Sequence, residues 1–276
     1  MVLLGLVLGV VVAVVFAANG CGSNRSRKHG GGHRGQVVAL TEKFRAAPAQ
    51  STSFRRSVHA ARRSDASGPF FGFRHAHMTR VDAPEQRAVA LTFDDGPGPA
   101  TGQIVGELRA LHARATFFVV GTMAAIRPDM VRAERQAGME VGNHTWTHPA
   151  MPTLTAAAQR LEIQRTNELL AHITGRRPRF FRPPNWRVGQ RTAGIVARER
   201  MVGVLRTVDT RDWTLPGTGA IVRSALRVRP GGIVAMHDAG GYTRAQTVAA
   251  VPAIVRGLRR RHLRLVTVGQ LYAGRR

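Results

Sequence analysis

Residues 88–97 of the chain read AVALTFDDGP. The apolar run from Ala88 to Phe93 has the length of a buried strand, and it ends at two adjacent acids, Asp94 and Asp95. The Gly-Pro pair that follows them predicts a turn. Two neighbouring carboxylates repel each other and bury little apolar surface, so they indicate a site in which one acid binds a cation and the other moves a proton. An ordinary Asp-Asp-Gly-Pro turn is the alternative interpretation.

Strand-length apolar runs alternate with helix-like segments from Gln86 to the end of the chain. The expected strands are residues 88–93, 115–120, 140–142, 179–182, 202–208, 232–236 and 263–267. The expected helices, which have apolar residues at 3.6-residue spacing, are 100–112, 122–137, 153–173, 189–200, 217–228 and 245–261. Repeated strand–helix units predict an α/β fold with a parallel sheet, either closed as a barrel or open and doubly wound.

Polar side chains follow five of these expected strands. They are Asp94 and Asp95, His144 and His148, Arg182, Asp209 and Asp212, and His237. In parallel α/β folds the carboxyl ends of the strands meet on one face, where active sites lie. We therefore expect these residues to converge.

The His144-x-x-x-His148 spacing is a weak metal signal alone, and His29 and His33 repeat it in a glycine-rich stretch, where we interpret it as chance. Together with Asp95, the pair gives a three-ligand set that leaves positions open for water and substrate, as in catalytic zinc sites. Zn²⁺ suits these ligands best, and Co²⁺, Mn²⁺ or Ni²⁺ would fit the same set.

The ordered motifs make residues 86–276 resemble the NodB-homology polysaccharide deacetylases, carbohydrate esterase family 4. The resemblance implies a distorted (β/α) barrel of about seven parallel strands, with an Asp-His-His metal site that removes acetyl groups from N-acetylated sugars. Its implied roles are metal binding by Asp95, His144 and His148, proton removal by Asp94, orientation of Asp94 by Arg182, protonation of the leaving amine by His237, and orientation of His237 by Asp212.

The resemblance also implies substrate contacts. The backbone N–H of Asn185 would bind the oxyanion, and Trp213 would form a wall of the acetyl pocket, with a place in the core as the alternative. Three positions depart from the family pattern. Asn185-Trp186 replaces an aromatic residue and a glycine, which predicts a reshaped sugar groove. Ala235 replaces a leucine, which predicts a wider pocket unless Met236 or Trp186 fills it.

The charge of the chain is strongly positive, at +25, but 39 of its 41 basic residues are arginines, as GC-rich coding sequences produce whatever the function. A basic surface attracts polyanions without specifying one. Aromatic residues make up only 6% of the chain, which argues against a stacking surface for nucleic acid, so no nucleic-acid partner is expected. The single cysteine, Cys21, excludes an intrachain disulfide.

The N-terminal part predicts export. Residues 1–18 include an uncharged apolar run, Val2 to Ala18, that fits a signal peptide or a membrane anchor, with lipidation at Cys21 as a weaker alternative. Arg25, Arg27 and Lys28 follow the run, which by the positive-inside rule argues against export. Residues 19–84 are too polar to build a core and are interpreted as a flexible linker. Residues 85–276 form the expected catalytic domain.

These observations predict a secreted or membrane-tethered enzyme on the outer face of the cytoplasmic membrane, which removes N-acetyl groups from N-acetylglucosamine polymers such as peptidoglycan or chitin. No obligate protein partner is expected. The alternatives are an O-acetyl esterase on xylan or another glycan, a binding protein for an anionic polymer, and a catalytically silent carbohydrate-binding relative.

Overall fold

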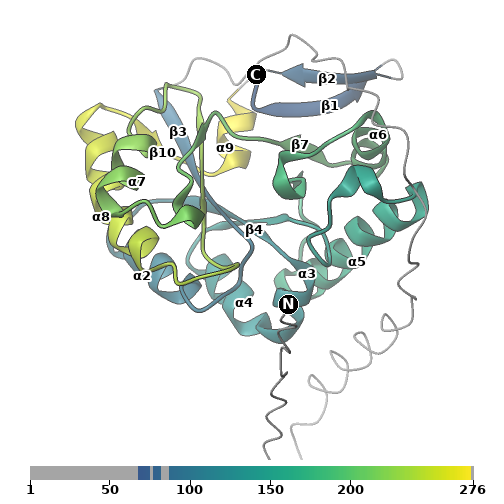
Figure 1. Cartoon of the computed structure of the whole chain (residues 1–276), viewed down its shortest axis with the longest axis horizontal. Helices are drawn as coiled ribbons and strands as arrows, with labels where there is room; N and C mark the ends of the chain where they lie inside the picture. The colour runs from purple at the N-terminus through teal and green to yellow at the C-terminus, as the bar shows by residue number, and fades with distance from the viewer. Residues whose placement is uncertain (1–67, 75–76, 82–86, 275–276) are drawn as a thin grey trace, which may run out of the picture. The chain divides into compact units, whose positions relative to one another are not determined.

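The computed structural model describes residues 68–74, 77–81 and 87–274. Its strands form a central sheet in the order β2-β1-β7-β6-β5-β4-β3-β9-β8, with β10 beside β3 (Figure 1). The strands are β1 Phe70–Arg74, β2 His77–Val81, β3 Ala88–Asp94, β4 Ala115–Val119, β5 Glu140–Asn143, β6 Phe180–Phe181, β7 Val202–Val204, β8 Val208–Asp209, β9 Ile233–His237 and β10 Arg264–Leu265. All pairs among β3 to β10 are parallel, which confirms the predicted α/β barrel-like fold.

The sheet curls because one short stretch of chain links distant parts of it. Strand β7 pairs with β6, whereas β8 pairs with β9, and only residues 205–207 separate β7 from β8. Residues 202–208 were expected to form one strand. They form two strands, because the backbone stops pairing with β6 after Val204 and begins to bond with β9 at Thr207, whose N–H donates to Ile233 O at 2.9 Å.

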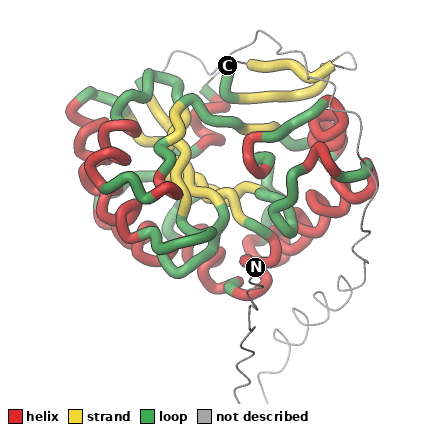
Figure 2. The backbone as a smooth tube through the Cα atoms, viewed as in Figure 1, coloured by secondary structure: helices red, strands yellow, loops and turns green. Residues whose placement is uncertain are grey.

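Helices surround the sheet on its outer side (Figure 2). They are α2 Thr101–Ala110, α3 Gly121–Ile126, α4 Pro128–Gln136, α5 Ala156–Thr174, α6 Gln190–Arg198, α7 Thr218–Ala225, α8 Ala245–Arg260 and α9 Val268–Ala273, with 3-10 turns η1 Met151–Thr153, η2 Pro184–Trp186 and η3 Asp212–Thr214. The expected helix 122–137 is divided into α3 and α4, because Pro128 lacks an N–H and disfavours helical backbone at Arg127. Helix α9 was not predicted. Its capping box joins Thr267 and Gln270.

Strands β1 and β2 lie within residues 19–84, which the sequence analysis assigns to a linker. For residues 70–81 the structure differs, since β1 pairs antiparallel with β7 and with β2. Phe70 and Phe71 explain the difference, because both rings are buried and Phe71 lies against Gly203, where a Cβ atom would collide with it. The apolar segment 1–18 and residues 19–67 lie outside the described residues. Within the described part of the chain, no helix combines the length and apolar character needed to cross a bilayer.

The two faces of β3 explain how the barrel makes room for a polar site. Val89, Leu91 and Phe93 pack into the main core with the helices, whereas Ala88 and Ala90 face a second cluster with Phe118 and Phe180. Small side chains on this inner face leave space for larger polar groups further along the strand. Consequently β3 carries apolar contacts at its start and carboxylates at its carboxyl end.

Glu134 on α4 is an exception within the core. It is fully buried, and both carboxylate oxygens lack a hydrogen-bond partner among the described residues. Burial raises the pKa of Glu134 well above its usual value, and the charge of Asp238 raises it further. The folded chain therefore favours the protonated acid.

Glu134 should make the folded state less stable as the pH rises. Above the ordinary glutamate pKa of about 4.5 the unfolded chain loses its proton while the folded chain keeps it, so the free energy of unfolding falls with increasing pH. We expect Glu134→Met to remove this contribution and to be more stable than the wild type by about 1 kcal/mol or more at neutral pH. Urea unfolding of both proteins at pH 5 and pH 7.5 measures the difference, and an equal difference at the two values would contradict the expectation.

Candidate active site

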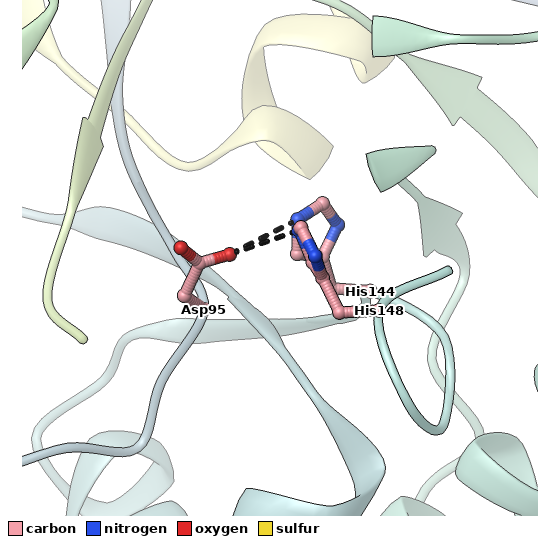
Figure 3. A group of neighbouring side chains, drawn as sticks. All are labelled: Asp95, His144 and His148. Atoms are coloured by element: carbon pink, nitrogen blue, oxygen red, sulfur yellow. Dashed lines mark ion pairs between the residues drawn. The ribbon is translucent and has the colours of Figure 1, made fainter. Parts of the chain in front are cut away.

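Three side chains from two loops meet at the carboxyl end of the sheet (Figure 3). Asp95 directly follows β3, and His144 and His148 follow β5. The Asp95 Oδ1 atom lies 3.5 Å from His144 Nε2 and 3.2 Å from His148 Nε2. One ligand atom from each residue lies within 4.8 Å of the others. The structure thus brings together the three residues that the sequence predicts as metal ligands.

The surroundings of this triad fit a divalent cation. Asp95 Oδ1 is buried and accepts no hydrogen bond from the described residues. His144 Nδ1 lies 2.7 Å from the carbonyl oxygen of Arg182, so Nδ1 carries the proton and the lone pair of Nε2 faces Asp95. Burial by itself would raise the pKa of Asp95, but the contacts with His144 and His148 outweigh it and lower that pKa. An ionised carboxylate and two imidazoles form a typical zinc donor set.

The loop that carries the histidines adopts a strained backbone. Thr145 has φ 71° and His148 has φ 59°, which for residues other than glycine costs roughly 1–2 kcal/mol each. Glu162 on α5 stabilises the loop, because its carboxylate accepts bonds of 2.8 Å from the N–H groups of Trp146 and Thr147. Sequence reasoning missed Glu162, since a glutamate in the middle of a helix carries no local signal of this contact.

Asp94 and Arg182 form a buried ion pair beside the triad. Arg182 Nη1 donates to Asp94 Oδ1 and to Thr92 Oγ1, each at 2.7 Å, and Nη2 donates to Leu205 O at 3.2 Å. The Arg182 guanidinium lies 4.0 Å from the Phe118 ring centre. Neither charged side chain is exposed by more than 2%. The Arg182 guanidinium fixes one oxygen of the Asp94 carboxylate, which leaves the other oxygen available.

His237 stands level with Asp94 on the neighbouring strand, in the β3–β9 register. Its ring Nδ1 lies 2.7 Å from Asp212 Oδ1, and its backbone N–H donates to Asp212 Oδ2 at 2.9 Å. Thr247 also donates to Asp212 Oδ2, at 2.7 Å. Burial opposes the charged imidazole, but the hydrogen bond and charge of Asp212, with the charges of Asp94 and Asp95, raise the pKa of His237 to about 9. At neutral pH His237 is protonated.

Asn185 and Trp186 occupy left-handed backbone conformations at the end of β6, with φ of 53° and 59°. Asn185 is exposed, and no acceptor among the described residues binds its backbone N–H. Trp186 is half-buried, and its ring centre lies 5.1 Å from the Arg182 guanidinium. The indole therefore packs on the residue that holds Asp94.

Two further predicted residues flank His237. Trp213 follows Asp212 and is 49% exposed, so a place in the core is excluded. Ala235 is buried in β9, and its neighbour Met236 packs into the main core on the opposite face of the strand. Met236 therefore does not occupy the space beside Ala235, and the expectation of a widened pocket there stays a prediction.

The loop after β9, which sequence reasoning did not assign to the site, packs against the acids. A Cβ atom on Gly240 would collide with the Asp95 carboxylate, so only glycine permits this approach. Buried Arg244 donates to the carbonyl oxygens of Ala239 and Gly240. Asp238 accepts from Thr101, and burial, together with the charges of Asp95 and Asp94, raises the pKa of Asp238 to about 7.

Comparisons with known proteins agree with this geometry. The polysaccharide deacetylase family profile matches residues 82–202. A chitooligosaccharide deacetylase from Bradyrhizobium sp. (strain ANU 289) is 34% identical over 206 residues, which cover 69% of this chain and 93% of that protein. A peptidoglycan-N-acetylglucosamine deacetylase from Bacillus cereus is 34% identical over 195 residues, which cover 67% of this chain and 88% of that protein.

A solved structure of a carbohydrate esterase is also similar to this chain. The family 4 carbohydrate esterase from Streptomyces lividans, in complex with acetate, superposes with a TM-score of 0.62 at 38% sequence identity. The match covers 64% of this chain and 91% of that one.

The triad should bind one Zn²⁺ per chain. We expect His148→Ala to weaken Zn²⁺ binding at least about 10-fold, because a ligand is lost while the other two stay in place. Isothermal titration with Zn²⁺ measures the affinity, and His262→Asn, which changes an exposed histidine beyond α8, serves as the control. Equal affinity in His148→Ala and the control would contradict the assignment.

Asp212 should set the protonation of His237. In metal-free protein, Asp212→Asn removes the charge and weakens the hydrogen bond that favour imidazolium, whereas the burial that disfavours it remains. We therefore expect the pKa of His237 to fall from about 9 in the variant, as followed by NMR titration of the imidazole ring. An unchanged pKa of His237 in Asp212→Asn would show that Asp212 does not favour the protonated imidazole.

Proposed function

Because the chain belongs to the polysaccharide deacetylase family, we propose that it hydrolyses N-acetyl groups on glycans that contain N-acetylglucosamine, with peptidoglycan as its substrate. The observation that carries this proposal is the placement of a carboxylate held by Arg182, Asp94, and a protonated imidazole, His237, on neighbouring strands beside Asp95, His144 and His148. Amide hydrolysis needs such a pair, because one group must accept a proton from water and another must give one to the departing nitrogen.

Asp95, His144 and His148 would hold the divalent cation, which we propose to be Zn²⁺. When bound, such an ion lowers the pKa of water and polarises a carbonyl group. The hydrogen bond from His144 Nδ1 to Arg182 O supports this role, since it fixes the ring with Nε2 turned to the site.

Asp94 is proposed to act as the general base. Its Oδ1 is engaged by Arg182, and the described residues place no hydrogen bond on Oδ2, so that oxygen can take the proton of the attacking water. Burial of the ion pair keeps bulk water from solvating the carboxylate. Arg182 thus acts as a positioning residue for the base.

His237 is proposed to act as the general acid. Its Nδ1–H donates to Asp212, which leaves the Nε2–H to protonate the amine as the carbon–nitrogen bond breaks. The raised pKa of His237 supports this role, because it keeps the proton in place at neutral pH.

The remaining predicted residues are proposed to shape the substrate pocket. The backbone N–H of Asn185, which binds no acceptor among the described residues, is available for the oxyanion that forms at the acetyl carbon. Exposed Trp213 would border the acetyl group, and Ala235 would enlarge its pocket.

The location of the enzyme is proposed to be outside the cytoplasm, where peptidoglycan lies. The uncharged run from Val2 to Ala18 supports export as a signal peptide or anchor. The positive charge of the chain supports retention in an anionic wall.

Asp94→Asn tests the proposed function most cheaply. The amide cannot accept the proton, so we expect acetate release from N-acetylglucosamine oligomers to fall at least about 100-fold, while Zn²⁺ binding remains. Acetate is measured enzymatically, and bound metal by elemental analysis of the same samples. Wild-type rates in a variant that retains its metal would contradict the role of Asp94.

A further inference from the structure

We propose that Arg206 recognises a carboxylate carried by a sugar of the substrate, and that the enzyme therefore prefers acidic glycans to neutral ones. The inference rests on the proposed function, because it names the class of glycan that the same site accepts. It concerns a residue that neither the predicted site nor the proposed catalytic steps include.

Arg206 lies near Arg182, the residue that holds the catalytic base. It belongs to residues 205–207, between β7 and β8, where Val204 faces the inner cluster and Leu205 faces the outer one. Arg206 directly follows Leu205, whose carbonyl oxygen accepts a hydrogen bond from the Arg182 guanidinium at 3.2 Å. Its guanidinium lies 4.1 Å from the Trp186 ring centre, and the guanidinium of Arg182 lies 5.1 Å from the same ring. A single indole therefore contacts both Arg206 and the arginine that binds Asp94.

Arg206 is held in a fixed orientation. Its Nε lies 3.0 Å from Asp209 Oδ2. The other oxygen of Asp209 accepts from the N–H of Arg211 at 2.9 Å, so the carboxylate is itself fixed. Stacking on Trp186 orients the plane of the guanidinium. An arginine that is already ordered in this way loses little conformational entropy when a ligand binds.

The outer edge of Arg206 remains available. Its side chain is 30% exposed, and no acceptor among the described residues binds its two terminal amino groups. These groups form the fork that matches the two oxygens of a carboxylate. Exposed Asn185 directly precedes Trp186, the residue on which Arg206 stacks. A sugar that reaches the Asn185 N–H can therefore present an acidic substituent to Arg206.

A purely structural role for Arg206 makes a different prediction. A partly exposed pair with Asp209 contributes about 0–1 kcal/mol to stability and has no reason to affect the choice of substrate. A carboxylate subsite instead changes the ratio of activities on acidic and neutral substrates, whatever the effect on stability.

The test compares two forms of one substrate. Peptide-free glycan strands whose sugars carry carboxylates are assayed beside the same strands after reduction of the carboxylates to alcohols. We expect kcat/KM for acetate release to be about 10-fold higher on the acidic form, mainly through KM, because a charge-assisted bond is lost on reduction. Arg206→Gln should bring the ratio close to one, and Arg206→Lys should give an intermediate ratio, since it keeps the charge without the fork.

Arg260→Gln is the matched control. It removes the same charge from an exposed position at the end of α8, the helix that starts beside the site and runs to the opposite end of the barrel. The control should keep the wild-type ratio. Because a ratio does not depend on the amount of folded enzyme, partial misfolding of a variant leaves the test valid.

Two results would overturn the inference alone. They are equal wild-type activity on the acidic and reduced strands, and an Arg206→Gln ratio that equals that of the wild type, in each case with acetate released from both strands. Absence of acetate release by the metal-loaded wild type from either strand would instead overturn the proposed function.

Discussion

The site depends on Arg182, whose side chain and main chain serve different parts of it. The guanidinium donates to Asp94 and fixes the carboxylate beside the cation ligands. The carbonyl oxygen of the same residue accepts the bond from His144 Nδ1, and its N–H donates to Asn143 O at the end of β5. A displacement of Arg182 would therefore disturb the base and a metal ligand together. Because the pair with Asp94 is fully buried, loss of the arginine would also leave an uncompensated charge, at a cost of roughly 3–5 kcal/mol.

The barrel supplies what this ion pair needs. The small side chains of Ala88 and Ala90 leave space on the inner face of β3. The Arg182 guanidinium fits there, over Phe118 and against Thr92. Two ion pairs stand at the strand ends, Arg182 with Asp94 and His237 with Asp212. Acid–base chemistry becomes possible because the Arg182 guanidinium holds the base, Asp94, in place, and the Asp212 carboxylate raises the pKa of the acid, His237.

Trp186, which departs from the family pattern, contacts two arginines in the structure. From sequence, an indole after Asn185 predicts only a reshaped groove. In the structure it forms a surface shared by two arginines, one buried beside the base and one partly exposed. The partly exposed one, Arg206, is the residue to which we assign the choice of an acidic glycan.

The sequence predicts the residues whose chemistry is visible in their type and position. Asp94, Asp95, His144, His148, Arg182 and His237 follow strands, and parallel topology brings strand ends together. Contacts made across the fold were not predictable in this way, because the partners lie far apart in the chain. Glu162 contacts the histidine loop from a helix, and Arg206 contacts Trp186 from the segment between β7 and β8. Residues 70–81 were assigned to a linker since polar neighbours obscure Phe70 and Phe71. Their burial appears only once β1 pairs with β7, where Phe71 lies against Gly203 and Phe70 joins the cluster of Val204.

The central claim is that one cation sits among Asp95, His144 and His148 while Arg182 holds Asp94 free to accept a proton. Anomalous diffraction from Zn²⁺-soaked crystals, recorded on both sides of the zinc absorption edge, tests it most directly. The account predicts a single strong peak within about 2.0–2.2 Å of one Asp95 oxygen and of Nε2 of both histidines, with Asp94 still bonded to Arg182. A peak elsewhere, or one ligated by Asp94 in place of Asp95, would contradict it.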